Sequence, residues 1–262
     1  MHRLYGLLAC AALAFAPMPV WAWGKTGHRV VGAIATQYLT PNARKAVIAV
    51  LGNETLAEAA NWPDFMRSNP DLFWQKTAAP WHYVTVPRGK TYEEVGAPPE
   101  GDGVTALARF AQTLQRQDAP LEDKKLALRF IVHIVGDLHQ PLHARLDTDR
   151  GGHDVAVTFF DTPTDLHVVW DEAIIDQQQL SYTEWTDLLL GRIMPEQARQ
   201  WSTADPPTWI RESVALRDTI YPDGAVLSYD YVYRHRAEVE LRLEQAGVRL
   251  AAFLNRVFDG KH

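Results

Sequence analysis

The chain contains almost no cysteine. One cysteine, Cys10, is present among 262 residues, and it lies in an apolar stretch at the N-terminus. A mature protein without that stretch has no disulfide, so its stability must come from a hydrophobic core or from bound metal. The length is sufficient for one large domain with a substantial core.

Long hydrophobic runs are also scarce. The only one covers residues 4–20, follows the basic residue Arg3, is interrupted by two prolines and is followed by the small residue Ala22. This pattern is typical of a secretory signal peptide cleaved after Ala22, and a retained membrane anchor is the alternative. We therefore expect a signal peptide at residues 1–22 and one domain at residues 23–262. The mature protein would be free of the membrane and would be periplasmic or secreted.

An excess of basic residues is missing as well. The sequence has 26 basic and 32 acidic residues, and removal of Arg3 leaves 25 basic residues and a net charge of −7. This balance argues against a protein that grips duplex DNA through its phosphates. Three Zn²⁺ ions would add six positive charges and could reverse the sign locally in one cleft. The charge gives no reason to expect assembly, so we expect a monomer.

Helical patterns dominate, and we find no repeat, no low-complexity tract and no domain boundary. The second helix has clear signals, with Thr40 as N-cap, Pro41 in the first turn and Gly52 after the end. We predict a single all-α domain with a small β-hairpin. The expected helices cover 26–39, 41–51, 104–117, 121–140 and 230–257, the expected extended pieces 81–86 and 151–159, and the expected loops 86–103 and 201–209.

Histidine is concentrated in one segment. Five of the ten histidines lie between His133 and His167. His133 and Asp137 are four residues apart, as are His167 and Asp171, so each pair shares one helix face. Pro141 ends the first helix, and His143 can turn back toward the same place. A single pair of this kind is usually an ordinary surface or core feature. Two pairs together with His143 indicate a zinc site that performs hydrolysis.

Other candidates lie nearer the N-terminus. After cleavage, the α-amino group and carbonyl of Trp23 could chelate a metal, with His28 close enough to join. Asp64 is a candidate carboxylate ligand or a helix N-cap, and His82 is a candidate ligand or a structural histidine. Arg67 could bind a phosphate, although an isolated arginine is usually a solvated surface residue. Tyr83, beside His82, is a candidate stacking surface or a structural residue.

Together these candidates make nine metal donors, a number that fits three metals if Asp137 bridges two of them. A group of metals with open positions can activate water near neutral pH and hold the attacking and leaving oxygens of a phosphodiester. The pattern therefore predicts phosphoester hydrolysis. The nine donors are Trp23, His28, Asp64, His82, His133, Asp137, His143, His167 and Asp171.

Five motifs in this order resemble the trinuclear-zinc nucleases of the S1/P1 family. They are Trp-Gly-x-x-Gly-His at 23–28, Trp-Pro-Asp at 62–64, Trp-His-Tyr at 81–83, His-x-x-x-Asp-x-His-Gln-Pro-Leu-His at 133–143 and His-x-x-x-Asp at 167–171. The resemblance implies an all-α fold shared with zinc phospholipases C. It also implies a zinc-dependent endonuclease that converts single-stranded DNA and RNA to 5′-phosphorylated products and acts as a 3′-nucleotidase. The C-terminal third carries no motif that we can match.

The resemblance also implies a division of ligands and roles. One zinc would take Asp64, His82, His133 and the bridging Asp137; the second would share Asp137 and take His28 and Trp23; the third would take His143, His167 and Asp171. Water activated between the first two would attack phosphorus, and the third would stabilise the leaving 3′-oxygen. Asp64, Arg67 and Asp137 form the catalytic set. Arg67 would neutralise charge on the phosphoryl oxygens, and Tyr83 would stack a nucleobase.

Some residues depart from the family pattern. Thr85 stands where relatives often have an Asp or Asn that binds the base, which puts base recognition in doubt. His153 replaces a common Asn and is interpreted as a loop residue. We expect His139 to orient a ligand instead of binding metal.

Two other functions compete with the nuclease. A zinc phospholipase C shares the ligand framework but resembles His-x-x-x-Glu where this chain has Asp171. A zinc-storing structural protein would need closed four-ligand sites, without a spare aromatic residue or arginine.

Overall fold

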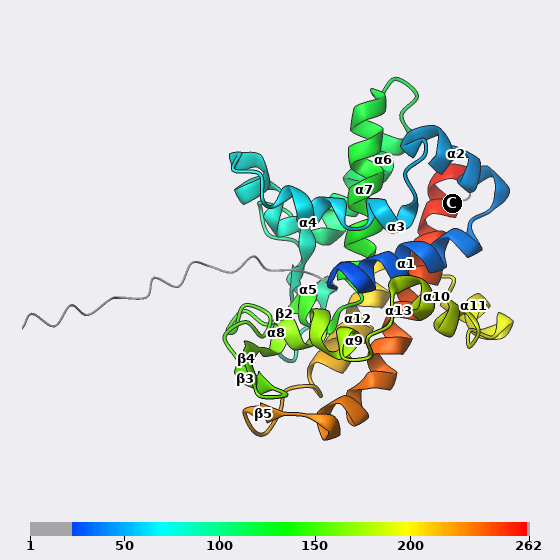
Figure 1. Cartoon of the computed structure of the whole chain (residues 1–262). Coiled ribbons are helices and arrows are strands. Elements are labelled where there is room, and N and C mark those ends of the chain that lie inside the picture. The colour runs from blue at the N-terminus through cyan, green and yellow to red at the C-terminus, as the bar shows by residue number, and fades with distance from the viewer. Residues whose placement is uncertain (1–22, 261–262) are drawn as a thin grey trace, which may run out of the picture.

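The computed structural model describes residues 23–260, so the expected signal peptide lies outside the described residues. Helices predominate in this part of the chain, which confirms the all-α fold class (Figure 1). The helices are α1 (Lys25–Tyr38), α2 (Pro41–Leu51), α3 (Leu56–Ala59), α4 (Trp62–Met66), α5 (Tyr92–Val95), α6 (Gly103–Gln115), α7 (Leu121–Asp137), α8 (Leu166–Val168), α9 (Ile174–Asp176), α10 (Tyr182–Leu190), α11 (Pro195–Trp201), α12 (Pro206–Arg217) and α13 (Tyr229–Asp259). Tighter or wider helical turns are η1 (Phe73–Thr77), η2 (Ala79–His82), η3 (Pro141–His143) and η4 (Val169–Ala173). The strands are β1 (Val84–Thr85), β2 (Ala144–Arg145), β3 (Ala156–Phe159), β4 (Thr162–Asp165) and β5 (Val226–Leu227).

Helix α13 is the long support of the fold and runs from the strand region to α2, with α1 crossing it (Figure 1). The two helices approach closely at Gly247, where an added Cβ would lie 2.4 Å from Cγ2 of Ile34. Glycine is therefore required at this crossing, because any side chain would push α1 away. The apolar faces of both helices belong to one continuous hydrophobic core.

Helix α7 carries the densest motif and is buried along its second half. Residues 130–137 are all buried, so this end of the helix lies inside the core. The helix ends at Asp137, three residues earlier than predicted. Gln140 adopts an extended conformation (φ −78°, ψ 120°) before Pro141, as a residue that precedes proline prefers. The chain then enters η3, which carries His143.

A two-stranded parallel pairing joins two distant segments. Strand β1 pairs with β2, with Val84 opposite Ala144 and Thr85 opposite Arg145. Strand β2 directly follows the turn of His143, and β1 follows the turn of His82 after one residue, so the pairing brings the two turns side by side. The prediction of an extended piece over 81–86 was wrong in its first part, because His82 lies in the 3-10 turn η2.

The expected hairpin is present but begins later than predicted. Strand β3 pairs antiparallel with β4, and residues 151–155 form turns that precede it. The connecting residues Phe160 and Asp161 adopt positive φ values of 45° and 66°. Strand β5 adds to β3 in parallel, a pairing that local pattern could not predict.

The predictions of two loops, at 201–209 and 86–103, were partly wrong. Pro206 and Pro207 open helix α12, where proline in the first turn costs no hydrogen bond and the Asp205 side chain accepts from the backbone N–H of Thr208. The loop over 86–103 contains the short helix α5.

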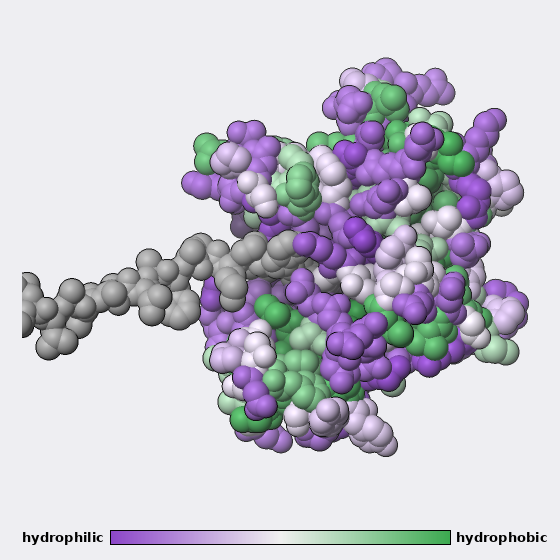
Figure 2. Space-filling model, viewed as in Figure 1, coloured by the Kyte–Doolittle hydropathy of each residue, from purple (hydrophilic) through white to green (hydrophobic). Residues whose placement is uncertain are grey.

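Within residues 23–260, no helix is both long enough and apolar enough to cross a membrane. On the face shown in Figure 2, apolar residues lie in separate small patches among polar ones.

Candidate metal centre

Buried histidine and aspartate side chains form three groups, each with potential ligand atoms within 4.8 Å of one another. Together they contain all eight side chains that the sequence predicts as metal ligands. The groups are His28, His133 and Asp137; Asp64, His82 and His133; and His143, His167 and Asp171.

Helix α7 connects the first two groups, because His133 belongs to both. The carboxylate of Asp137 also faces both of them. Its Oδ1 lies 3.3 Å from Nε2 of His28, and its Oδ2 lies 3.1 Å from Nδ1 of His82 and 3.2 Å from Nε2 of His133. This position fits the expected bridging carboxylate.

Backbone carbonyls orient three of the rings. Nδ1 of His133 donates to the carbonyl of Ala60 at 2.7 Å, and Nδ1 of His143 donates to the carbonyl of His82 at 2.6 Å. Nδ1 of His167 donates to Gly151 at 2.6 Å. Each bond fixes the tautomer and leaves the Nε2 lone pair for the interior of its group, as in metal-binding histidines.

The third group is built on a helix with an unusual turn. Asp165 caps α8, and the chain widens into the π-type turn η4 before Asp171. Nε2 of His167 still lies 3.0 Å from Oδ2 of Asp171, so the predicted four-residue spacing brings these side chains together. The amide of Gln140 donates to Oδ1 of Asp171 and fixes the carboxylate from the side of α7.

Asp64 is not a helix N-cap. It is the third residue of α4 and is buried, and its Oδ1 lies 3.6 Å from Nε2 of His133. Arg67 follows the same helix, with Nη1 3.7 Å from Oδ1 of Asp64. Its side chain is 22% exposed, so it is not a freely solvated surface arginine.

Several buried polar atoms of these groups have no hydrogen-bond partner. They include both ring nitrogens of His28, Oδ1 of Asp64, Oδ1 of Asp137 and Nε2 of His143. Burying such atoms without partners costs about 1–3 kcal/mol each. Their convergence is explained if they ligate a cation, and a mixed set of imidazole nitrogen and carboxylate oxygen suits Zn²⁺. The residues present therefore fit the expected metal.

The charge states also favour cation binding. Burial lowers the pKa of His28, His82 and His143, so these rings are neutral and available as ligands. Burial also disfavours charge on His133, but the Asp137 and Asp64 carboxylates outweigh this effect and raise its pKa to about 9. The carboxylates thus stabilise positive charge where the first two groups meet.

Trp23 lies beside the first group. It is fully buried, an added Cβ on Gly136 would lie 3.7 Å from its Cδ1, and the N–H of the next residue, Gly24, donates to the carbonyl of Asp171 at 2.7 Å. Metal binding by its α-amino group requires cleavage after Ala22 and stays a prediction.

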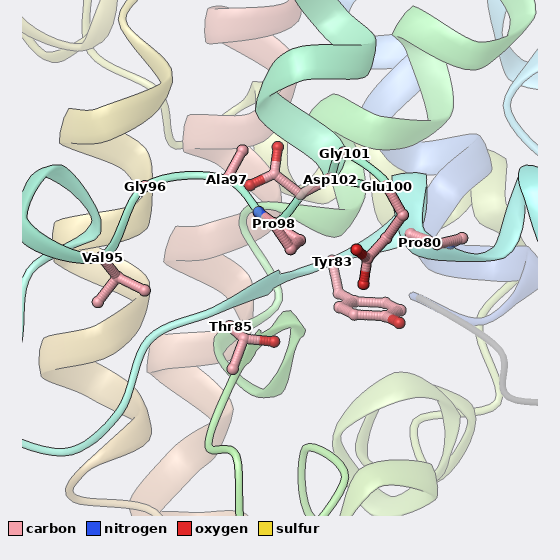
Figure 3. Close-up of a pocket in the computed structure, with 10 residues that line it drawn as sticks. All are labelled: Pro80, Tyr83, Thr85, Val95, Gly96, Ala97, Pro98, Glu100, Gly101 and Asp102. Carbon is pink, nitrogen blue, oxygen red and sulfur yellow. The ribbon is translucent and has the colours of Figure 1, made fainter.

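Tyr83, which follows the candidate ligand His82 in the sequence, borders a pocket of about 350 Å³ (Figure 3). Thr85 and Pro80 contribute to the same pocket, and the loop of residues 95–102 forms its opposite wall. In Figure 3 the carboxylate of Glu100 points from this loop toward the Tyr83 ring.

His153 and His139, which the sequence does not predict as metal ligands, lie in different surroundings. His153 lies in a loop and in none of the three groups, as expected, but its ring stacks on His167 with centroids 3.9 Å apart. His139 forms no hydrogen bond to a candidate ligand side chain, so the expectation that it orients one is corrected. Its Nδ1 donates to the carbonyl of Val135, and its Nε2 accepts from Arg249 at 3.2 Å.

Two residues of the site were missed by sequence reasoning. Gln140 stands inside the recognised motif, but nothing local shows that it contacts Asp171. Arg145 has its guanidinium 3.5 Å from the ring centre of Tyr83, and burial lowers its pKa to about 10, so it stays charged. Its position two residues after the predicted ligand His143 is the one feature of the sequence that indicates a place in the site.

Comparison with known proteins agrees with this geometry. The protein-family model described as S1/P1 Nuclease matches residues 23–259. The chain is 31% identical to Endonuclease 4 of Arabidopsis thaliana, covering 91% of this chain and 90% of that protein. It is 27% identical to Nuclease S1 of Aspergillus oryzae, covering 98% of each, and 29% identical to Nuclease P1 of Penicillium citrinum, covering 90% of this chain and 97% of that protein.

Proposed function

Because the chain belongs to the S1/P1 nuclease family, and is thus a hydrolase of phosphodiester bonds, we propose that it is an exported zinc-dependent endonuclease. Its substrates are single-stranded DNA and RNA, its products carry 5′-phosphates, and it also removes the phosphate of 3′-nucleotides. A signal peptide cleaved after Ala22 directs it to the periplasm or the medium, where it acts as a monomer.

The observation that carries this proposal is the contact between the first two ligand groups. They share His133, and Asp137 lies within 3.3 Å of a ring nitrogen of His28, His82 and His133. The proposed cofactor is three Zn²⁺ ions, with Trp23 completing the group of His28. Bound zinc supplies an activated water and stabilises the oxygen that leaves phosphorus.

The protein residues around this centre have separate tasks. Neutral imidazoles and buried carboxylates hold the ions in place, and Gln140 fixes Asp171. Arg67 lies beside Asp64 and binds the phosphoryl oxygens of the substrate. Tyr83 stacks a base in the pocket that it shares with Thr85. Only an unpaired base can leave its own stack to enter such a pocket, which favours single strands.

A phospholipase C is not favoured. The relatives named above are nucleases, and the third group ends in Asp171 where the phospholipase pattern has glutamate.

The test uses protein that begins at Trp23 and has a known zinc content. Single-stranded DNA, RNA, a 3′-nucleotide and phosphatidylcholine are assayed side by side, with and without chelator. We expect about three zincs per chain and chelator-sensitive cleavage of the first three substrates. Cleavage of phosphatidylcholine with intact nucleic acid would identify a phospholipase. Zinc binding without activity on any substrate would favour the zinc-storing alternative.

A further inference from the structure

Arg145 is partly buried, and its surroundings differ from those of the fully buried arginines of residues 23–260. Arg217 bonds the carboxylate of Asp218, and Arg242 and Arg249 both bond that of Glu212. Within the same residues, the side chain of Arg145 forms no ion pair and no hydrogen bond, and its Nε is buried without a partner. A guanidinium in such surroundings is costly unless an anion joins it.

The side chain of Arg145 is nevertheless held in one place. Its backbone carbonyl accepts from the N–H of Val86 at 2.8 Å, within the pairing of β1 and β2. Its guanidinium stacks on the Tyr83 ring. On another side the loop passes so closely that a Cβ on Gly151 would lie 2.8 Å from its Cγ. The charge is therefore positioned before any ligand binds, which lowers the entropic cost of binding.

The surroundings of Arg145 indicate what the ligand is. It follows the candidate zinc ligand His143 by two residues, and the charges that act on it include the Asp171 and Asp137 carboxylates and the Arg67 guanidinium. Gly151 connects Arg145 to the third metal group, because its carbonyl accepts from Nδ1 of His167 and an added Cβ on it would lie 3.3 Å from Nε of Arg145. An anion with several oxygens, placed at the metal groups, would satisfy both arginines.

We propose that Arg145 is a second phosphate-binding residue, whose guanidinium donates to a non-bridging oxygen of the phosphate that is cleaved. This inference rests on the proposed function. It adds Arg145 to Arg67 as a second positively charged side chain that binds the phosphate. Arg145 is absent from the lining of the base pocket, so it covers a different part of the Tyr83 ring from the part that faces the pocket. Tyr83 thereby contacts the base and positions the group that binds the phosphate attached to the same nucleoside.

The test measures binding of inorganic phosphate to the zinc-loaded protein by calorimetry, for the native chain, Arg145→Gln and Arg145→Lys. Arg88→Ala is the matched control, because Arg88 follows the same strand pair but is 60% exposed and faces Asp218 at 3.6 Å. We expect Arg145→Gln to weaken phosphate binding at least ~10-fold, since a charged hydrogen bond is lost. Arg145→Lys should keep part of the affinity, and Arg88→Ala all of it. Zinc content and melting temperature are measured on every variant.

A purely structural role for Arg145 makes a different prediction. It would change stability or zinc content but leave phosphate affinity unchanged at equal zinc content, and that result would overturn the inference. For oligonucleotide cleavage, Arg145→Gln should also reduce the slope of log(kcat/KM) against log salt by about 1. If Arg145→Gln unfolds or loses zinc, Arg145→Lys carries the test, and wild-type phosphate affinity in that variant at equal zinc content would overturn the inference.

The two proposals can fail separately. A protein that binds phosphate through Arg145 but cleaves no nucleic acid would overturn the proposed function and leave this inference standing. An active nuclease whose phosphate affinity does not depend on Arg145 would overturn the inference alone.

Discussion

An added Cβ on Gly136 would lie 2.9 Å from Nδ1 of His28. The two residues come from different helices, α7 and α1, and the missing side chain lets the His28 ring lie against α7 next to Asp137. Glycine weakens a helix interior by roughly 0.5–1 kcal/mol relative to alanine, so its presence one residue before the candidate bridging ligand needs a reason. Room for the His28 ring provides it.

We therefore predict that Gly136→Ala preserves the helix but displaces His28 from Asp137. The variant should lose about one zinc per chain and at least ~10-fold in kcat/KM, as expected when ligand placement is disturbed. Zinc analysis and nuclease kinetics check this outcome. Gly224→Ala is the control, because an added Cβ there meets no atom within 4 Å. Full zinc content and normal activity in Gly136→Ala would show that the ring can move without consequence.

Asp137→Asn should be the most damaging single substitution in the centre. An amide is a poorer ligand than a carboxylate and cannot bridge two metals, so both groups that meet at Asp137 are affected. We expect more than ~100-fold loss of kcat/KM and a clear loss of zinc. Asp123→Asn, an exposed change in the first turn of the same helix, should leave both unchanged. Near-native zinc content in Asp137→Asn would mean that Asp137 is not the bridge.

The proposed role of Trp23 can be tested within one preparation. A protein carrying residues ahead of Trp23, joined through a cleavable site, should bind about two zincs and have little activity, because its N-terminal nitrogen is an amide and not an amine. Cleavage that exposes Trp23 should restore the third zinc and the activity. Full activity before cleavage would remove Trp23 from the ligand set.

The sequence predicted the parts of the structure that depend on local signals. Helix α2 begins at Pro41 and ends before Gly52, as its capping residues indicate, and Gly52 has the positive φ of 68° typical of a residue after a helix end. The His133–Asp137 pair lies on one helix face because the helical repeat fixes that geometry.

The sequence could not predict the contacts that depend on tertiary packing. The pairing of Val84 with Ala144 joins segments 60 residues apart, and such pairings follow from the packed fold and not from neighbouring residues. The same pairing places Arg145 on Tyr83, a contact that no local pattern predicts. The pair Pro206-Pro207 predicts a loop, but the cap at Asp205 places both prolines in the first turn of α12.

The last prediction concerns stability far from the metals. Glu244 lies on α13 and is only 8% exposed; burial and the nearby Glu240 carboxylate raise its pKa to about 7, while Arg192 opposes this shift. Burial raises the pKa of Tyr38 at the end of α1, and the Glu244 carboxylate raises it further. A carboxyl with a folded pKa above its unfolded value of 4.5 destabilises the protein as pH rises from about 4.5 to about 7, because the unfolded chain ionises more readily. Below that window the group contributes nothing.

Glu244→Gln should therefore raise the free energy of unfolding by ~1–2 kcal/mol above pH 7, after allowance for solvent screening, and by nothing near pH 4.5. Chemical unfolding of both chains at each pH, at equal zinc concentration, gives this difference with all other titrations cancelled. Gln112→Ala, an exposed substitution on α6 that removes no titratable group, is the control, and its effect on stability should be the same at every pH. A constant difference for Glu244→Gln across the range would show that Glu244 is ionised in the folded protein at its ordinary pKa, because only a shifted carboxyl makes the effect of the substitution depend on pH.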